Sequence, residues 1–181
     1  IAATTKLHNL KIGAEVYWVD AGWYGHEDKI DWKDNIGDWV PDPKFYPNGL
    51  HPLGDALKQM GLGFLLWMAP ELARTGSTLQ TQHPYWFLPP SPNHLCLIKM
   101  GDPEVRKGIT DFVTNTLSDA GATWFRQDFD SCYDDAAGDD LRPDRVGMAD
   151  IRYVTGFYAF WDGLRKNIPG LQIDNCDSGG K

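Results

Sequence analysis

The chain of 181 residues is long enough to bury a core, and its 42% of hydrophobic residues sets it apart from disordered proteins. Its 25 acidic residues outnumber the 17 basic ones, and the net charge of −8 disfavours binding to the phosphate backbone of nucleic acids. The longest apolar run, 62–70, falls short of the roughly 18 residues that a membrane helix needs. We therefore expect neither a nucleic-acid partner nor a membrane partner.

Aromatic residues and aspartate are both abundant. Aromatic residues make up 13% of the chain, eight of them Trp, and 21 of the 25 acids are Asp. Aspartate favours caps, turns and strand ends over helix interiors. Carboxylates that bind hydroxyl groups and indoles that stack on C–H faces suit a sugar-binding cleft, although an acidic surface explains the same composition.

The cysteines Cys96, Cys132 and Cys176 are far apart and form no Cys-x-x-Cys motif. This pattern predicts neither a zinc site nor a disulfide framework, and it favours a reducing, cytoplasmic location. The histidines also lack the paired spacing of metal ligands. We therefore expect no metal and no cofactor. Because the sequence starts without Met and stops directly after an expected strand, we also expect a piece of a longer protein.

Hydrophobic periodicity and turn residues predict strands that alternate with helices. After a helix that ends near Gly13, the expected strands cover 15–19, 64–68, 123–126 and 171–173, and the expected helices cover 50–60, 103–120 and 148–167. Such alternation indicates parallel strands joined by right-handed helical crossovers.

The predicted loops differ in length at the two ends of the strands. Those that follow strands, at 21–48, 72–101 and 130–146, are long and rich in Asp, Trp or Pro, whereas those that follow helices are short. This asymmetry is typical of a (β/α)8 barrel, whose active site uses the loops after the strands. A doubly wound sheet is the alternative, but it usually has a Gly-rich phosphate loop after its first strand. The fold class predicted for 1–181 is therefore α/β, a partial (β/α)8 TIM barrel, because eight βα units need roughly 250 residues.

Polar side chains end or follow each expected strand. They are Asp20, Glu71, Asp128 and Cys176, with Trp23, Trp39 and Trp67 nearby. Parallel strands would bring these groups to one mouth, where two acids flanking a scissile bond are the requirement for glycoside chemistry. For any single Asp, a turn or strand-end role is the simpler explanation, but it explains less well why the acids recur at the ends of successive strands.

Asp128 is the candidate nucleophile. Arg126 and Asp128 are two residues apart on an expected strand, so their side chains point the same way. A neighbouring guanidinium favours the ionised carboxylate, which is a competent nucleophile in a cleft of low dielectric. A structural Arg–Asp ion pair is the alternative.

Segments spread along the chain resemble a known family. They are 17–24 (YWVDAGWY), 37–39 (GDW), 45–50 (FYPNGL), 66–71 (LWMAPE), 83–86 (HPYW), 126–129 (RQDF), 160–162 (FWD) and 174–180 (DNCDSGG). In this order they are similar to the catalytic barrel of the family 36 glycoside hydrolases, the α-galactosidases or melibiases, in a bacterial branch. The resemblance implies barrel strands 2–5 and an oligosaccharide or glycoside substrate, and it allows a homo-oligomer.

The same resemblance implies roles for individual residues. Asp128 would be the nucleophile of a retaining mechanism that passes through a covalent glycosyl-enzyme intermediate. Arg126 would contact sugar hydroxyls. Together with the strand-end argument, the resemblance gives as substrate-binding residues Asp20, Trp23, Trp67, Glu71, Arg126, Cys176 and Gly179. The general acid/base of this family lies beyond the fifth strand, so we expect it outside 1–181 and expect these residues alone to be inactive.

The chain departs from the family pattern at a few positions. Ala21 and Ala69 stand where Asp and Glu are usual, and Asp130 and Lys181 stand where Asn and Arg are usual. These departures concern sugar specificity more than the reaction class. The alternatives are therefore another α-glycosidase or a transglycosylase on the same fold, or a non-catalytic carbohydrate-binding barrel.

Overall fold

The computed structural model describes residues 13–25, 31–128 and 144–176, together with Ala2, Thr5, Lys6 and Lys11. Its elements are β1 (Val16–Val19), η1 (Trp32–Asn35), α2 (His51–Gln59), β2 (Gly63–Met68), β3 (Leu72–Arg74), α3 (Thr78–Gln82), η2 (Pro84–Trp86), β4 (Leu95–Leu97), α4 (Pro103–Ala120), β5 (Trp124–Asp128), α5 (Met148–Asn167) and β6 (Gln172–Cys176). Gly179, Cys132 and Asp130 lie outside the described residues, as does most of the expected loop 130–146.

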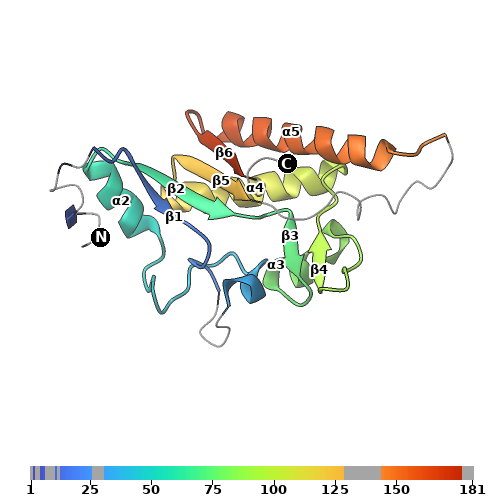
Figure 1. The fold of residues 1–181 in the computed structure, drawn as a ribbon, viewed down its shortest axis with the longest axis horizontal. Coiled ribbons are helices and arrows are strands. Elements are labelled where there is room, and N and C mark those ends of the chain that lie inside the picture. The colour runs from blue at the N-terminus through green and yellow to red at the C-terminus, as the bar shows by residue number, and fades with distance from the viewer. Residues whose placement is uncertain are drawn as a thin grey trace.

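A four-stranded sheet in the order β1-β2-β5-β6 is the centre of the fold, and every neighbouring pair in it is parallel. Helices α2, α4 and α5 connect successive strands of this sheet, and α4 and α5 lie side by side along it (Figure 1). The predicted alternation of parallel strands and helices, a partial α/β barrel, is confirmed.

Local sequence explains where the helices start and stop. Asp102 caps α4, since its Oδ1 accepts the N–H groups of Glu104 and Val105 at 2.9 and 3.4 Å. Pro103 occupies the first turn, where its missing N–H costs nothing. Gly121 ends the helix in the left-handed conformation, with φ 71°.

The two faces of the sheet have different surroundings. Along β5, Phe125 and Gln127 are fully buried against α5, where Phe125 meets Phe160 edge-on at 6.2 Å between ring centroids. Because side chains alternate along a strand, Arg126 and Asp128 lie on the opposite face, and both are partly exposed. The helices therefore cover one face, and the polar strand-end groups occupy the other.

The expected loop 72–101 is not a loop throughout. β3 and β4 form an antiparallel pair in which Leu72 faces Leu97 and Arg74 faces Leu95, and α3 and η2 lie between them. This small hairpin projects from the parallel sheet (Figure 1). The prediction was wrong here because strands of three residues are too short to show a hydrophobic period.

Two strands also extend beyond their predicted ends. β5 continues to Asp128 and β6 to Cys176, and these two residues are paired in the sheet. Their polar side chains interrupted the apolar pattern, although the backbone ladder continues through them. Among the described helices, none combines the length and apolar character that crossing a membrane requires.

Candidate active site

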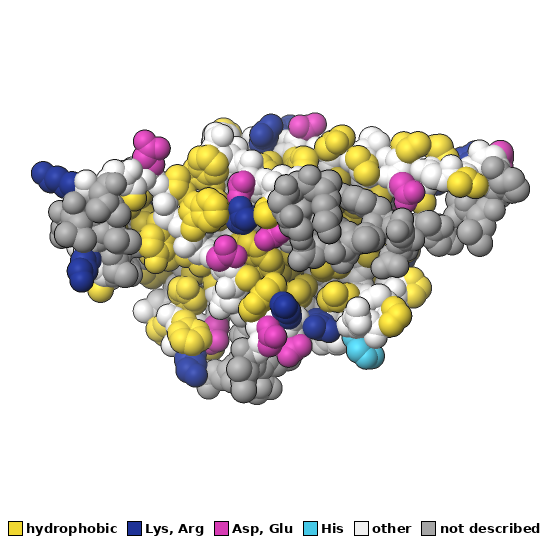
Figure 2. Space-filling view, viewed as in Figure 1, with side chains coloured by type: hydrophobic (Ala, Val, Ile, Leu, Met, Phe, Trp, Pro, Cys, Tyr) yellow, Lys and Arg dark blue, Asp and Glu magenta, His cyan; other side chains and the backbone are white. Residues whose placement is uncertain are grey.

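Side chains from neighbouring strands are aligned on the open face of the sheet. Trp67 on β2 is in register with Arg126 on β5, and Arg126 is in register with Asp174 on β6. One layer further along, Asp128 is in register with Cys176. Figure 2 shows acidic and basic side chains gathered among hydrophobic ones over the strands of the sheet.

Asp128 is the last residue of β5. The indole Nε1 of Trp67 donates a long hydrogen bond of 3.4 Å to its Oδ2. The carboxylate is thus at the carboxyl end of a parallel strand, the edge at which (β/α)8 enzymes carry their chemistry. It is partly exposed, so a substrate can reach it.

Arg126 pairs with Asp174 and not, as the sequence suggested, with Asp128. Its Nη1 donates a hydrogen bond to Asp174 Oδ2, and its guanidinium carbon lies 4.9 Å from the ring centroid of Trp18. Burial acts to lower the pKa of Arg126, but the hydrogen bond and charge of Asp174, with smaller effects of Cys176 and Asp128, raise it above its usual value. Arg126 is therefore a permanent cation held across the strands.

An aromatic cluster supports Trp67, which is 3% exposed. The Trp23 indole donates to the Trp67 carbonyl at 2.7 Å, and the Tyr24 ring stacks on Trp67 at 6.1 Å between centroids. The ring centroids of Trp39 and Trp67 are 6.1 Å apart, and the Trp32 ring packs edge-on against Trp67 with 5.4 Å between centroids. Packing on several sides fixes the direction of the indole N–H that reaches Asp128.

The pKa of Tyr24 is raised strongly by burial, with further contributions from the charges of Asp20 and Asp31. Its hydroxyl therefore stays neutral over the whole physiological range. Tyr24 accordingly contributes packing beneath Trp67 and no charge to the open face.

The remaining predicted residues do not all reach the open face. Asp20 is exposed just after β1, and its Oδ1 accepts the Ala21 N–H at 2.7 Å. Trp23 is 1% exposed and supports Trp67 from behind. Glu71 is fully buried at the start of the β3–β4 hairpin, where its carbonyl accepts the Ile98 N–H at 2.8 Å.

Sequence reasoning missed the roles of Asp174 and Trp18 beside Arg126. The alternation of side chains would have placed Asp174 on the face of Cys176 if the fourth strand had been extended by three residues. For Trp18 the signal was its place two residues before Asp20. No group of three or more His, Cys, Asp and Glu side chains in the described ranges is arranged to hold a metal ion.

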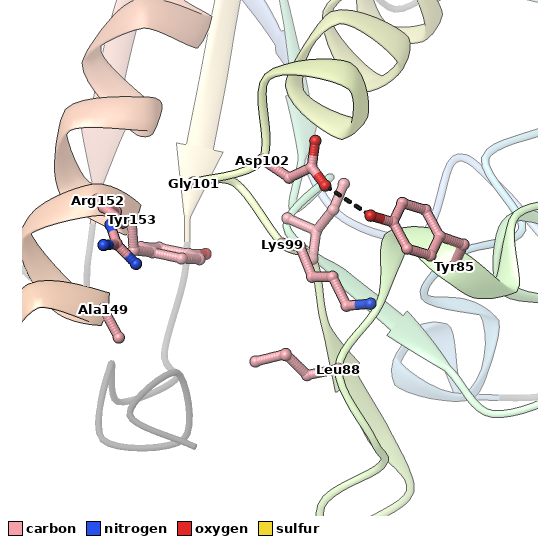
Figure 3. Close-up of a pocket in the computed structure, with 9 residues that line it drawn as sticks. Tyr85, Leu88, Lys99, Gly101, Asp102, Ala149, Arg152 and Tyr153 are labelled. Atoms are coloured by element: carbon pink, nitrogen blue, oxygen red, sulfur yellow. Dashed lines mark hydrogen bonds between the residues drawn. The ribbon is translucent and has the colours of Figure 1, made fainter. Parts of the chain in front are cut away.

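A separate cavity of about 300 Å³ lies between the hairpin, the segment that leads into α4 and the start of α5. In it Tyr85 Oη donates to Asp102 Oδ2 at 2.9 Å, and Lys99 Nζ lies 4.4 Å from the Tyr85 ring centroid. Arg152 and Tyr153 face them from α5 across the opening (Figure 3). Because Asp102 both lines this cavity and caps α4, a change at this residue affects the cavity and the stability of the helix together.

Comparison with known families agrees with this geometry. A sequence model of the melibiase family matches residues 3–181, which is nearly the whole chain. The chain belongs to the melibiase family. Its relatives in this family are named α-galactosidases, which are glycoside hydrolases.

Other members of the melibiase family are similar along almost the whole chain. Alpha-galactosidase Mel36A of Lactobacillus acidophilus is 32% identical over 177 residues, which are 94% of this chain and 24% of the relative. Alpha-galactosidase AgaA of Geobacillus stearothermophilus is 28% identical over 176 residues, with the same coverage of 94% and 24%. This chain thus spans about a quarter of the length of these curated relatives.

Solved structures from this family share the fold. The crystal structure of the α-galactosidase from Lactobacillus brevis superposes with a TM-score of 0.81 at 27% identity, over 99% of this chain and 25% of that one. A variant of the family 36 α-galactosidase AgaA, solved in complex with raffinose, gives a TM-score of 0.78 at 27% identity, over 97% and 26%. The resemblance to family 36 glycoside hydrolases is confirmed.

Proposed function

We propose that residues 1–181 form part of the catalytic barrel of a retaining α-galactosidase that hydrolyses terminal α-galactosides. The observation that carries the proposal is the Asp128 carboxylate at the end of β5, with the Trp67 indole on one of its oxygens. Arg126, Asp174 and Cys176 surround it on the same face. The names of the relatives supply the sugar, since they are α-galactosidases.

Asp128 is the nucleophile in this proposal. One of its oxygens attacks the anomeric carbon, the bond from that carbon to the leaving oxygen breaks, and a carboxylic acid protonates the leaving oxygen. Water then attacks the same carbon, and the group that protonated the leaving oxygen, now a carboxylate, takes a proton from this water. The bond between the anomeric carbon and Asp128 breaks, and its electron pair returns to the Asp128 carboxylate. Two inversions give net retention.

In this proposal the general acid/base lies outside residues 1–181. In a retaining enzyme its carboxyl group stands roughly 5–5.5 Å from the nucleophile. Asp174 does not take this role in the proposal, because its Oδ2 is bound to Arg126.

Substrate recognition is assigned to the layer around Asp128. Arg126 and Asp20 bind sugar hydroxyls, Trp67 provides an apolar wall, and Cys176 with Gly179 forms the floor. Raffinose and stachyose, which occur in complexes of related α-galactosidases, are the oligosaccharides to test first.

The remaining features of the proposal concern the protein as a whole. In the described part of the chain, β1 and β6 are each paired on one side only, and Trp18 on the open face is 52% exposed. We therefore propose that 1–181 expressed alone associates and is inactive; a soluble monomer with cooperative unfolding would overturn this. Among the described residues, Cys96 and Cys176 form no disulfide, and a reducing, cytoplasmic location is part of the proposal. Light scattering of the complete protein tests whether it forms a homo-oligomer.

The decisive experiment replaces Asp128 by Ala in the complete protein. Asp128→Ala should lower kcat on an aryl α-galactoside by several orders of magnitude, because no group attacks in the first step. Azide fits the vacated space and attacks the anomeric carbon directly, so it should restore turnover and yield the β-galactosyl azide after a single inversion.

Asp130→Ala is the matched control, because it removes a carboxylate two residues further along the sequence. It should be milder and should show no azide rescue. Near-normal turnover of Asp128→Ala would overturn the assignment, and sugar binding without turnover in the unaltered protein would favour a non-catalytic carbohydrate-binding barrel.

A further inference from the structure

Arg126 has two carboxylates within reach on the open face. Asp174 is paired with it on the neighbouring strand β6, and adjacent strand backbones are about 4.8 Å apart. Asp128 is two residues further along β5, a backbone distance of about 6.6 Å. An extended Arg side chain spans either distance. Whether Asp128 is a free nucleophile or one half of an ion pair depends on which of these two carboxylates Arg126 binds.

The structure shows which partner Arg126 takes. Its Nη1 is hydrogen-bonded to Asp174 Oδ2, while among the described residues the hydrogen bond to Asp128 Oδ2 is the long one of 3.4 Å from Trp67 Nε1. The Arg126 side chain is 16% exposed and that of Asp174 33% exposed, so water screens this pair weakly. A carboxylate bound by a guanidinium has its lone pairs engaged in strong, charge-assisted hydrogen bonds.

Trp18 helps to keep the guanidinium in this position. Its ring lies 4.9 Å from the guanidinium carbon, which is the range of a cation–π contact. Arg126 is thus held by an aromatic ring from β1 and a carboxylate from β6. Neither contact uses Asp128.

We propose that Asp174 is a positioning residue that holds Arg126 away from Asp128 and so leaves the Asp128 carboxylate free to attack. This inference rests on the proposed function, in which Asp128 is the nucleophile. Without Asp174, Asp128, two residues along β5 on the same face, is the carboxylate that remains within reach of Arg126 in the described part of the chain. Asp174 itself touches no reacting atom.

The test is a double-mutant cycle in the complete protein, with kcat and KM measured separately on an aryl α-galactoside. Asp174→Ala should lower kcat by about tenfold to a hundredfold, the effect of one charge-assisted hydrogen bond on a rate, with a smaller change in KM. In an Arg126→Gln background the same substitution should change kcat by less than about threefold, because the competing cation is gone. Asp174→Glu keeps the carboxylate and should recover most of kcat.

Asp111→Ala is the matched control. It removes the partner of Lys107 from an exposed pair on α4, where Nζ and Oδ2 are 2.6 Å apart, and should leave kcat unchanged. If Asp174→Ala does not fold, as judged by circular dichroism, Asp174→Asn retains an acceptor for Arg126 and should give an intermediate loss of kcat. Equal losses of kcat in both backgrounds, or an unchanged kcat in Asp174→Ala, would overturn the inference. Full activity of Asp128→Ala would instead overturn the proposed function, so the two failures are distinguishable.

Discussion

Trp67 and Asp128, on adjacent parallel strands, are joined by an indole N–H that reaches the carboxylate at 3.4 Å. The indole is held from behind by Trp23, which donates to the Trp67 carbonyl at 2.7 Å. A buried tryptophan is thus directed toward the proposed nucleophile by its packing, and a rigid support of this kind is what a reacting carboxylate needs.

Replacing Trp67 by Phe should remove this hydrogen bond and keep most of the aromatic packing against Tyr24 and Trp39. A hydrogen bond to a charged group is worth about 1.5–3 kcal/mol, and the long distance puts this one at the lower end. We expect kcat/KM to fall by about tenfold, with a small change in melting temperature. Trp32→Phe, which alters the edge neighbour of Trp67, is the control and should change kcat/KM much less.

The Asp102 cap of α4 gives a prediction about pH. Burial acts to raise the pKa of Asp102, but hydrogen bonds from Tyr85, Glu104 and Val105 and the charge of Lys99 outweigh it and lower the pKa. A carboxyl group whose folded-state pKa is lowered stabilises the fold above its unfolded pKa of about 3.9, and this contribution is lost as pH falls through the lower folded-state value.

Asp102→Ala should therefore lower the free energy of unfolding by about 1 kcal/mol at pH 7, the usual effect of losing such a cap. The difference from the unaltered protein should shrink below about pH 4, as measured by denaturant unfolding across pH. Tyr85→Phe removes one donor to Asp102 Oδ2 but leaves the capping Oδ1, so its effect should be smaller. A difference that grows on acidification would contradict this account.

The interface between α5 and the sheet should depend on Phe160. Its side chain is fully buried and meets Phe125 edge-on at 6.2 Å. Phe160→Ala should lower the free energy of unfolding by about 3–5 kcal/mol, because it leaves a cavity between the helix and β5. Ile151→Ala on the same helix removes a side chain that is 59% exposed, so its cost should stay near 0.5 kcal/mol. Similar costs for both variants would show that α5 is not packed through Phe160.

The sequence predicted the parallel sheet because its signals are local. Gly121 marks a helix end and the run Phe64–Met68 is apolar, so each element could be read from a few neighbouring residues. The place of Asp128 followed from the same signals, since it comes at the end of a strand. The resemblance to family 36 added the order of the motifs along the chain.

Partners that depend on register could not be predicted. Arg126 and Asp174 are separated by 48 residues, and only the pairing of β5 with β6 brings them together. Trp23 is likewise buried beside a contact between residues distant in sequence, the antiparallel bridge of Tyr24 with Pro41. The sequence alone predicts which residue types lie at the carboxyl ends of the strands, whereas the structure shows which of these residues are in contact.

Trp161 Nε1 on α5 donates to Gln127 Oε1 on β5 at 2.7 Å, and Gln127 is fully buried between Arg126 and Asp128 in the sequence. Trp161→Phe leaves the amide oxygen without this donor, which should lower the free energy of unfolding by about 1–3 kcal/mol. Gln127→Met, of similar length, should cost somewhat less, because Trp161 is partly exposed and water can reach its N–H.

Combining both substitutions removes both polar groups, so the double variant should be more stable than the sum of the single losses predicts, by about 1 kcal/mol or more. Denaturant unfolding of the four proteins measures this coupling. Strictly additive losses would mean that packing, and not the hydrogen bond, joins α5 to the strand that carries Asp128.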